Sequence, residues 1–231
     1  MKPGRIVTFS GLDGCGKTTQ IEALVAALEA QGQTPYRVWS RGGYTEGVLL
    51  LKRALRRALG RRAPPPGPSQ AREKTLGDPR VAQVWLTVAM LDLVRLYGLE
   101  LPVRKALGQT VVCDRYLWDT LADFKVNFPD QPVEQGLLWR LLAAVSARPD
   151  GAFFLALDPT EAERRALEKQ DPFPEPTEAR RRRAAIYEDL LARGLFTRLD
   201  ATAAREAIAA RIRGELGLGP GSPVTPKAQP T

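Results

Sequence analysis

Histidine is absent from this chain of 231 residues, and cysteine occurs only twice. Without histidine, a general base or a metal site built on imidazole is excluded, so any chemistry must rely on Asp, Glu, Lys, Arg and backbone amides. Cys15 and Cys113 each lie inside a separate motif, which argues against a disulfide framework and indicates a reducing compartment.

Long apolar runs are missing as well. No segment is apolar for long enough to cross a bilayer, and the first residues lead into a β-like run without the apolar region of a signal peptide. We therefore expect a cytoplasmic protein that does not associate with a membrane. The net charge of +8 favours an anionic ligand, whether a nucleotide or a nucleic acid, but does not distinguish between them.

The hydrophobic pattern alternates short strands with helices along the chain. Apolar and β-branched runs predict strands at residues 5–10, 36–39, 110–113, 152–157 and 195–199. Helical spacing predicts helices at residues 18–30, 80–107, 117–126, 132–147, 160–169, 177–193 and 201–216, the second of them bent at Pro102. Five buried strands separated by helices predict an α/β domain, with a parallel sheet covered by helices on both faces.

Three segments rich in proline or glycine interrupt this pattern. Residues 56–79 mix Pro, Gly and basic side chains and are expected to form an exposed insertion. The region 160–180 contains a proline-rich stretch between two helices and is expected to act as a flap. Residues 217–231 have the composition of a disordered tail, which leaves one domain at residues 1–216.

A phosphate-binding loop follows the first predicted strand. Residues 11–18 match the pattern G-x-x-x-x-G-K-[ST] and open a predicted helix, which is the context that this loop requires. Backbone N–H groups of such a loop surround phosphate oxygens, Lys17 reaches the β- and γ-phosphates, and Thr18 binds Mg²⁺. The residues predicted to bind ATP are Gly11, Gly14, Cys15, Gly16, Lys17, Thr18 and Thr19.

The second motif contains Asp114, directly after the strand predicted at residues 110–113. In enzymes with this loop, the second carboxylate lies at the carboxyl end of a strand beside the phosphates, where it binds the metal. Taken alone, an Asp in this position is also a common helix cap. Together with the loop, it predicts transfer of the γ-phosphoryl group of ATP.

With both motifs in view, the chain resembles the thymidylate kinase family. The resemblance rests on residues 9–20 and on Val112-Cys113-Asp114-Arg115-Tyr116. It extends over about residues 5–216 and includes Arg148-Pro149-Asp150, Leu157-Asp158-Pro159, Tyr187 and Leu199-Asp200-Ala201. It implies a P-loop NTPase fold, a three-layer sandwich with strand order 2-3-1-4-5, and ATP with Mg²⁺. It also implies a nucleoside monophosphate as acceptor, most simply dTMP, and usually a homodimer.

The resemblance also implies roles for individual residues. Asp13 matches the residue that contacts the acceptor's sugar hydroxyl or the metal, Asp114 matches the carboxylate on the Mg²⁺ side, and Arg115 matches the arginine that grips the acceptor's phosphate. Gly14 occupies a position where some members carry a catalytic arginine. Members without it supply a cation from the flap, which points to Arg164, Arg165 and Lys169.

The acceptor site departs from the family pattern. Arg41 is present in a loop that lacks the Glu-Pro usual in the family. Arg95 matches a phosphate-binding arginine of the family only after a shift of register. Asp123 stands where an aromatic residue is expected. Trp85 could stack on a base, although an aromatic on an apolar helix face usually belongs to the core. The residues predicted to bind the acceptor are Asp13, Arg41, Arg95, Arg115, Tyr116 and Thr120.

Several alternatives stay open at this point. A nucleoside kinase is favoured if Asp119 or Asp123 deprotonates a hydroxyl or sets base specificity, and a regulatory protein could bind ATP without turnover. A GTPase is disfavoured because no Asn-Lys-x-Asp sequence occurs, and nucleic-acid binding rests only on the basic residues 56–62. The charged runs 161–165 and 180–183 are ordinarily solvated helix faces.

Overall fold

The computed structural model describes residues 4–41, 79–168 and 175–219. These residues form a five-stranded sheet in the order β2-β3-β1-β4-β5, and every neighbouring pair of strands is parallel. The strands are β1 (Ile6–Ser10), β2 (Tyr36–Trp39), β3 (Val111–Asp114), β4 (Gly151–Ala156) and β5 (Thr197–Asp200). The predicted fold class and strand order are therefore confirmed, with strand ends that shift by one or two residues.

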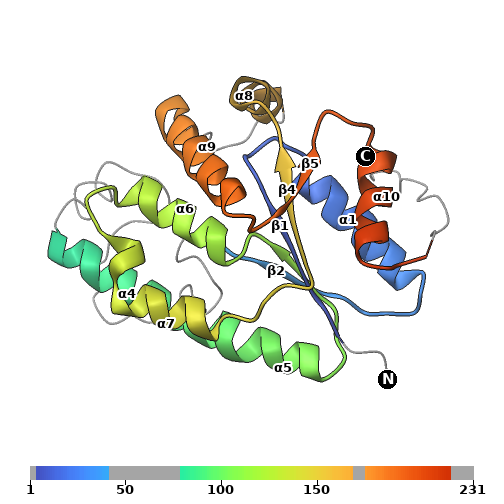
Figure 1. Cartoon of the computed structure of the whole chain (residues 1–231), viewed down its shortest axis with the longest axis horizontal. Coiled ribbons are helices and arrows are strands. Elements are labelled where there is room, and N and C mark those ends of the chain that lie inside the picture. Colours follow the sequence, from blue (N-terminus) through green and yellow to red (C-terminus); the bar gives the residue numbers. More distant parts are fainter. Residues whose placement is uncertain (1–3, 42–78, 169–174, 220–231) are drawn as a thin grey trace, which may run out of the picture.

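Helices cover both faces of this sheet (Figure 1). One face carries α1 (Lys17–Glu29) and α10 (Arg205–Glu215), which pack against each other. The other face carries α4 (Pro79–Arg95), α5 (Leu101–Ala106), α6 (Leu117–Asn127), α7 (Leu137–Val145) and α9 (Thr177–Ala192). The helix α8 (Pro159–Glu168) lies beyond the carboxyl ends of the strands, where the phosphate-binding loop also lies.

The long helix predicted at residues 80–107 is interrupted. A π-helical turn, η2 (Leu96–Glu100), separates α4 from α5, and the N–H of Leu101 donates to the carbonyl of Leu96. Pro102 occupies the first turn of α5, where its missing N–H leaves no bond to the preceding turn. The expected irregularity thus exists, but it lies in the turn before Pro102 and divides the helix in two.

Two other helix boundaries differ from the prediction. The segment predicted at 132–147 begins with a 3₁₀ turn, η3 (Val133–Gln135), and α7 starts only at Leu137. The last helix starts at Arg205 because Asp200 ends β5 in a tight turn. The carboxylate of Asp200 accepts hydrogen bonds from the backbone and the hydroxyl of Thr202, which favours a turn over another helical residue.

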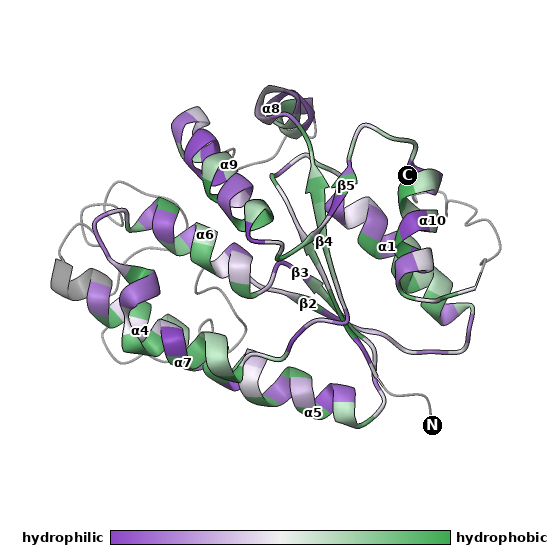
Figure 2. Ribbon diagram, in the orientation of Figure 1, coloured by the Kyte–Doolittle hydropathy of each residue, from purple (hydrophilic) through white to green (hydrophobic). Residues whose placement is uncertain are grey.

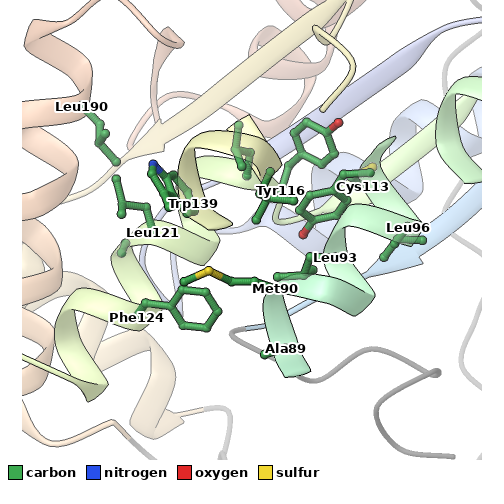
Figure 3. Packing of buried hydrophobic residues seen from close by; sticks show 14 of the residues in the cluster. Ala89, Met90, Leu93, Leu96, Cys113, Tyr116, Leu121, Phe124, Trp139 and Leu190 are labelled. Carbon is green, nitrogen blue, oxygen red and sulfur yellow. The ribbon is translucent and has the colours of Figure 1, made fainter. Parts of the chain in front are cut away.

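The core consists of two hydrophobic clusters, one on each face of the sheet. Figure 2 shows hydrophobic residues along β4 in the centre and polar residues over much of α8 and α9. In the larger cluster, Met90 of α4 lies between Leu93 of the same helix and Phe124 of α6, and Trp139 of α7 lies near Leu121 (Figure 3). Burial of apolar surface contributes roughly 25 cal/mol per Å² to the free energy of folding. The apolar faces of these helices therefore fix the helices on the sheet.

Some predictions lie outside the described residues. They concern all but the last residue of the insertion at 56–79, residues 169–174 of the flap and residues 220–231 of the tail. Within the described part of the chain, no helix combines the length and apolar character needed to span a membrane.

Candidate active site

The phosphate-binding loop connects β1 to α1. β1 ends at Ser10, and α1 begins at Lys17, one residue earlier than predicted. Gly14 and Gly16 have φ angles of 91° and 95°. This backbone conformation is strained for a residue with a Cβ atom but is accessible to glycine. The glycines of the motif are thus needed for the backbone path, and the helix begins with its N–H groups and positive dipole end at the loop.

Lys17 is folded back over this loop. Its ammonium donates to the carbonyl oxygens of Gly11 at 3.0 Å and Leu12 at 2.9 Å, and it lies 3.8 Å from the carboxylate of Asp13. The side chain is almost fully buried. The positive charge is therefore held above the loop by the loop itself, at the place where a nucleotide's terminal phosphates are expected to bind.

Asp13 gathers cations from three parts of the chain. Its carboxylate accepts from Arg115 at 2.6 Å, lies 3.1 Å from Arg41, and faces Lys17 from within the loop. Burial alone would raise the pKa of this carboxyl, but the charges of Arg115, Lys17 and Arg41 outweigh it and hold the pKa well below its ordinary value. Asp13 is therefore an anion that fixes the positions of three cations.

Arg115 adopts an unusual backbone conformation directly after β3. It is the one non-glycine residue with a positive φ, 73°, in the part of the chain that the structure describes. Such a conformation costs on the order of 1 kcal/mol and needs support from its surroundings. The support comes from its N–H, which donates to the carbonyl of Phe9, and from its buried guanidinium, which donates to the hydroxyl of Tyr187 at 3.1 Å.

Asp119 of α6 is the buried centre behind Arg115. Its carboxylate accepts from Ser10 Oγ at 2.6 Å, from the backbone N–H of Tyr116 at 3.0 Å and from the hydroxyl of Tyr187 at 2.7 Å, and it lies 3.8 Å from Arg115. Burial raises the pKa of Asp119, while Arg115 and these donors oppose the rise. One carboxylate thereby joins β1, α6 and α9. From the sequence, Asp119 was a candidate only for deprotonating a hydroxyl or setting base specificity in an alternative nucleoside kinase.

Asp114 and Thr18 have the properties expected of a magnesium site. Asp114 lies at the carboxyl end of β3, and its Oδ1 atom is buried without a hydrogen-bond partner among the described residues. Thr18 lies in the first turn of α1 and is exposed. A hard cation such as Mg²⁺ takes carboxylate and hydroxyl oxygens together with water, so these two residues fit it.

The comparisons with known proteins agree with this geometry. No protein-family profile matches the chain. A thymidylate kinase from Solidesulfovibrio magneticus is 34% identical over 155 residues, which cover 66% of this chain and 64% of that protein. A thymidylate kinase from Bifidobacterium longum is 29% identical over 218 residues, 92% of this chain and 97% of that protein. Another, from Synechococcus sp. strain RCC307, is 31% identical over 171 residues, 73% of this chain and 74% of that protein.

The chain belongs to the thymidylate kinase family. The sequence-based identification is therefore confirmed at the level of the family, and with it the expectation of a nucleoside monophosphate kinase fold. The first relative is matched over slightly less than two thirds of its length.

The structure brings some of the predicted acceptor residues together and leaves one apart. Arg41 lies at Asp13 with Arg115, as described above. Arg95 is instead half-exposed on α4, where its guanidinium pairs with Asp92 at 3.0 Å and Glu100 at 2.8 Å. Arg95 is therefore part of a surface ion-pair network that is separate from the group of cations around Asp13.

Tyr116 and Thr120 lie buried beneath the site. The hydroxyl of Tyr116 donates to the carbonyl of Ala147 at 3.0 Å. Thr120 shares a hydrogen bond of 3.3 Å with Tyr97, whose hydroxyl is also 2.6 Å from that of Ser40. These contacts fix α6 against the strand ends, so both residues support the site from behind.

The flap helix α8 packs directly on the phosphate-binding loop. A Cβ atom built on Gly14 would lie 2.3 Å from the carbonyl oxygen of Ala162, so no side chain fits at the position where some family members carry arginine. Arg164 is exposed and pairs with Glu161 and Glu168, and Arg165 pairs with Glu161. Neither arginine reaches the loop in this conformation, and Lys169 lies outside the described residues.

The basic run at residues 180–183 differs from the expected solvated face. Arg180 and Arg183 are buried, whereas the two arginines between them are exposed. Arg183 pairs with Asp123 of α6 and with Glu175. Helical spacing was the one feature of the sequence that could have indicated this burial. Positions 180 and 183 fall on the same face of α9 as the buried Tyr187 and Leu190. The burial of these two arginines was not predicted from the sequence.

Proposed function

We propose that this chain transfers the γ-phosphoryl group of ATP to dTMP, giving ADP and dTDP. The observation that carries the proposal is the contact between Asp13 of the phosphate-binding loop and Arg115, the arginine that the family resemblance assigns to the acceptor's phosphate. The relatives from Solidesulfovibrio, Bifidobacterium and Synechococcus, all of them thymidylate kinases by name, support dTMP as the acceptor.

The proposed mechanism rests on positioning and charge. The oxygen of a monophosphate acceptor is already anionic at neutral pH, so no general base has to remove a proton from it. Arg115 and Arg41 would bind the acceptor's phosphate on one side, and Lys17 would bind the donor's terminal phosphates on the other. Asp13 would hold these cations in place and contact the sugar hydroxyl of the acceptor or the metal.

The donor site is proposed to use the whole loop. ATP would bind through Gly11, Gly14, Cys15, Gly16, Lys17, Thr18 and Thr19, while Thr18 and Asp114 would hold Mg²⁺. The bound ion would neutralise charge on the phosphates during transfer. Arg164 and Arg165 remain the predicted source of a cation from the flap, and this role requires their guanidinium groups to leave Glu161.

A panel of acceptors tests the proposal. The purified full chain is given ATP and Mg²⁺ with dTMP, dUMP, other monophosphates or thymidine, and the loss of ATP is followed together with the phosphorylated product. We expect dTMP to be preferred. Lys17→Met should lower turnover by roughly two to three orders of magnitude, while the matched control Lys105→Met, at a surface ion pair with Asp150, should retain activity. Transfer to thymidine but not to dTMP would refute the proposal.

The proposal also covers assembly and location. Residues 1–216 would form one kinase domain that works as a homodimer in the cytoplasm, where the two free cysteines would stay reduced. Apolar side chains exposed on α4 and α7, among them Leu91, Leu137 and Leu141, offer a surface for the second copy. Light scattering at micromolar concentration should give twice the mass of 25.4 kDa, and Leu141→Glu should reduce it.

A further inference from the structure

The guanidinium of Arg115 is held at its two ends by groups in different surroundings. One end, Nη2, donates to Asp13 of the phosphate-binding loop at 2.6 Å. The other end, Nη1, donates to the hydroxyl of Tyr187 at 3.1 Å and lies 3.8 Å from the carboxylate of Asp119. The side chain of Asp13 is 23% exposed, whereas that of Asp119 is 1% exposed. The Nη2 end therefore faces the accessible side of the site, and the Nη1 end is enclosed by the protein.

The contacts of Asp119 favour its anionic form. Its carboxylate accepts from the hydroxyl of Ser10 at 2.6 Å and from the backbone N–H of Tyr116 at 3.0 Å. The hydroxyl of Tyr187 accepts from Arg115, so its own hydrogen is directed to Asp119 at 2.7 Å. A carboxylate that accepts several hydrogen bonds beside a guanidinium is stabilised in its charged form. Asp119 thus supplies a buried negative charge to the enclosed end of Arg115.

Binding of an acceptor phosphate requires a change at the accessible end of Arg115. Phosphate oxygens accept from arginine as the carboxylate of Asp13 does, so the two compete for the same N–H groups. If Asp13 were the sole anchor, Arg115 would lose its position when the phosphate replaced it. The anchor at Nη1 is built from β1, α6 and α9 and does not depend on Asp13. It can therefore keep the guanidinium oriented during this exchange.

We propose that Asp119 is a positioning residue for recognition of the acceptor's phosphate. Its carboxylate, together with the hydroxyl of Tyr187, holds the Nη1 end of Arg115 so that the Nη2 end stays turned toward the phosphate-binding loop. This inference rests on the proposed function, because Arg115 is assigned there to the acceptor's phosphate. It adds a residue that acts through Arg115 and that lies three positions beyond the motif ending at Tyr116.

Binding measurements with and without the acceptor's phosphate test this role. Calorimetry on the full chain with Mg²⁺ compares dTMP, thymidine and ATP in the wild type and in Asp119→Asn, which keeps the shape of the side chain but removes its charge. We expect the affinity for dTMP to fall by about tenfold or more, and the affinities for thymidine and ATP to stay within about twofold. In steady-state kinetics the KM for dTMP should rise while the KM for ATP stays the same.

A matched control separates this effect from a loss of stability. Asp150 likewise joins β1 to a cation, because it accepts from the N–H of Ile6 at 2.8 Å and lies 2.8 Å from Lys105. It lies at the opposite end of β1 from the loop. Asp150→Asn should lower the unfolding midpoint and leave all three affinities unchanged. If Asp119→Asn does not fold, Tyr187→Phe removes the bridging hydroxyl and should weaken dTMP a few-fold relative to thymidine.

A double-mutant cycle asks whether Asp119 acts through Arg115. Arg115→Met should itself weaken dTMP. In that background, Asp119→Asn should change the affinity for dTMP by less than about twofold, because the group that it positions is gone. A loss of equal size in both backgrounds would overturn the positioning role. Equal weakening of dTMP and thymidine in Asp119→Asn, or no weakening of either, would overturn it as well.

The positioning role and the proposed function fail in different ways. If dTMP is phosphorylated normally and Asp119→Asn leaves its KM unchanged, only the positioning role is wrong. If the wild type binds dTMP with the expected dependence on Asp119 but transfers no phosphoryl group to any monophosphate, the positioning role stands and the proposed function is wrong. A wild type that binds no monophosphate overturns both.

Discussion

The guanidinium of Arg115 donates to Asp13 across 2.6 Å and so connects the end of β3 with the phosphate-binding loop after β1. Arg41 and Lys17 approach the same carboxylate. Three positive charges at this distance would repel one another without it. A single anion therefore holds three cations together at the carboxyl ends of β1 and β3.

Asp13→Asn is expected to lower both stability and turnover. The amide keeps the shape of the side chain but leaves buried Arg115 without the nearer of its two anions, which should cost roughly 2–4 kcal/mol of unfolding free energy. Turnover should fall by at least about tenfold, because the charge that holds Arg115, Arg41 and Lys17 in place is gone. Chemical denaturation and steady-state kinetics measure the two effects. Asp189→Asn, at a surface pair with Arg193, is the control and should change neither by much.

The same contact predicts a pH dependence of stability. The folded state holds the pKa of Asp13 below its ordinary value of 3.8, so the stabilisation is complete above about pH 5 and is lost as the pH falls through the folded pKa. Denaturation midpoints measured between pH 6 and pH 3 should fall less steeply in Asp13→Asn than in the wild type. Parallel curves for the two proteins would show that Asp13 does not carry this dependence.

Tyr187→Phe removes one oxygen that links α9 to the site. The hydroxyl accepts from Arg115 and donates to Asp119, and both partners are buried. Because the loss leaves two charged groups short of a hydrogen bond, we expect a cost of about 1–3 kcal/mol and a lower turnover. Tyr36→Phe also removes a single hydroxyl, which bonds Glu100 at the surface, and should cost less and leave turnover intact.

The sequence predicted those parts of the site that are local in the chain. Residues 11–18 specify their own loop, and Asp114 follows from the strand before it, so both are found where the pattern placed them. The partners of Asp119 could not be predicted in this way. Ser10 lies 109 residues from it and Tyr187 lies 68 residues away, and only the packing of α6 and α9 on the sheet brings them together.

Charged runs were the least informative part of the sequence. Arg180 and Arg183 look like members of a solvated basic cluster, and the burial of Arg183 follows from the position of Asp123 on the helix that α9 contacts. The same composition in α8 gives the opposite result, because Arg164 lies on an exposed face and pairs with glutamates of its own helix. Burial here depends on helix orientation, which composition does not encode.

Gly14→Ala tests the packing of the flap helix on the loop. The added Cβ would meet the carbonyl oxygen of Ala162 at 2.3 Å in a backbone conformation with positive φ. Gly32→Ala is the matched control, because Gly32 also has a positive φ but no atom near its Cβ position. We expect Gly32→Ala to cost about 1 kcal/mol. Gly14→Ala should cost clearly more and should weaken ATP binding, and equal effects would show that strain alone matters.

Asp114→Asn tests the magnesium site. The Oδ1 atom of Asp114 is buried and accepts no hydrogen bond from the described residues, so an unligated protein should lose little when its charge is removed. Unfolding in the presence of a chelator should therefore stay within about 0.5 kcal/mol of the wild type. The Mg²⁺ concentration for half-maximal turnover should rise by at least about tenfold, because a neutral amide is a poorer ligand for a hard cation. A variant that is unstable in chelator but has an unchanged Mg²⁺ requirement would make Asp114 a structural residue.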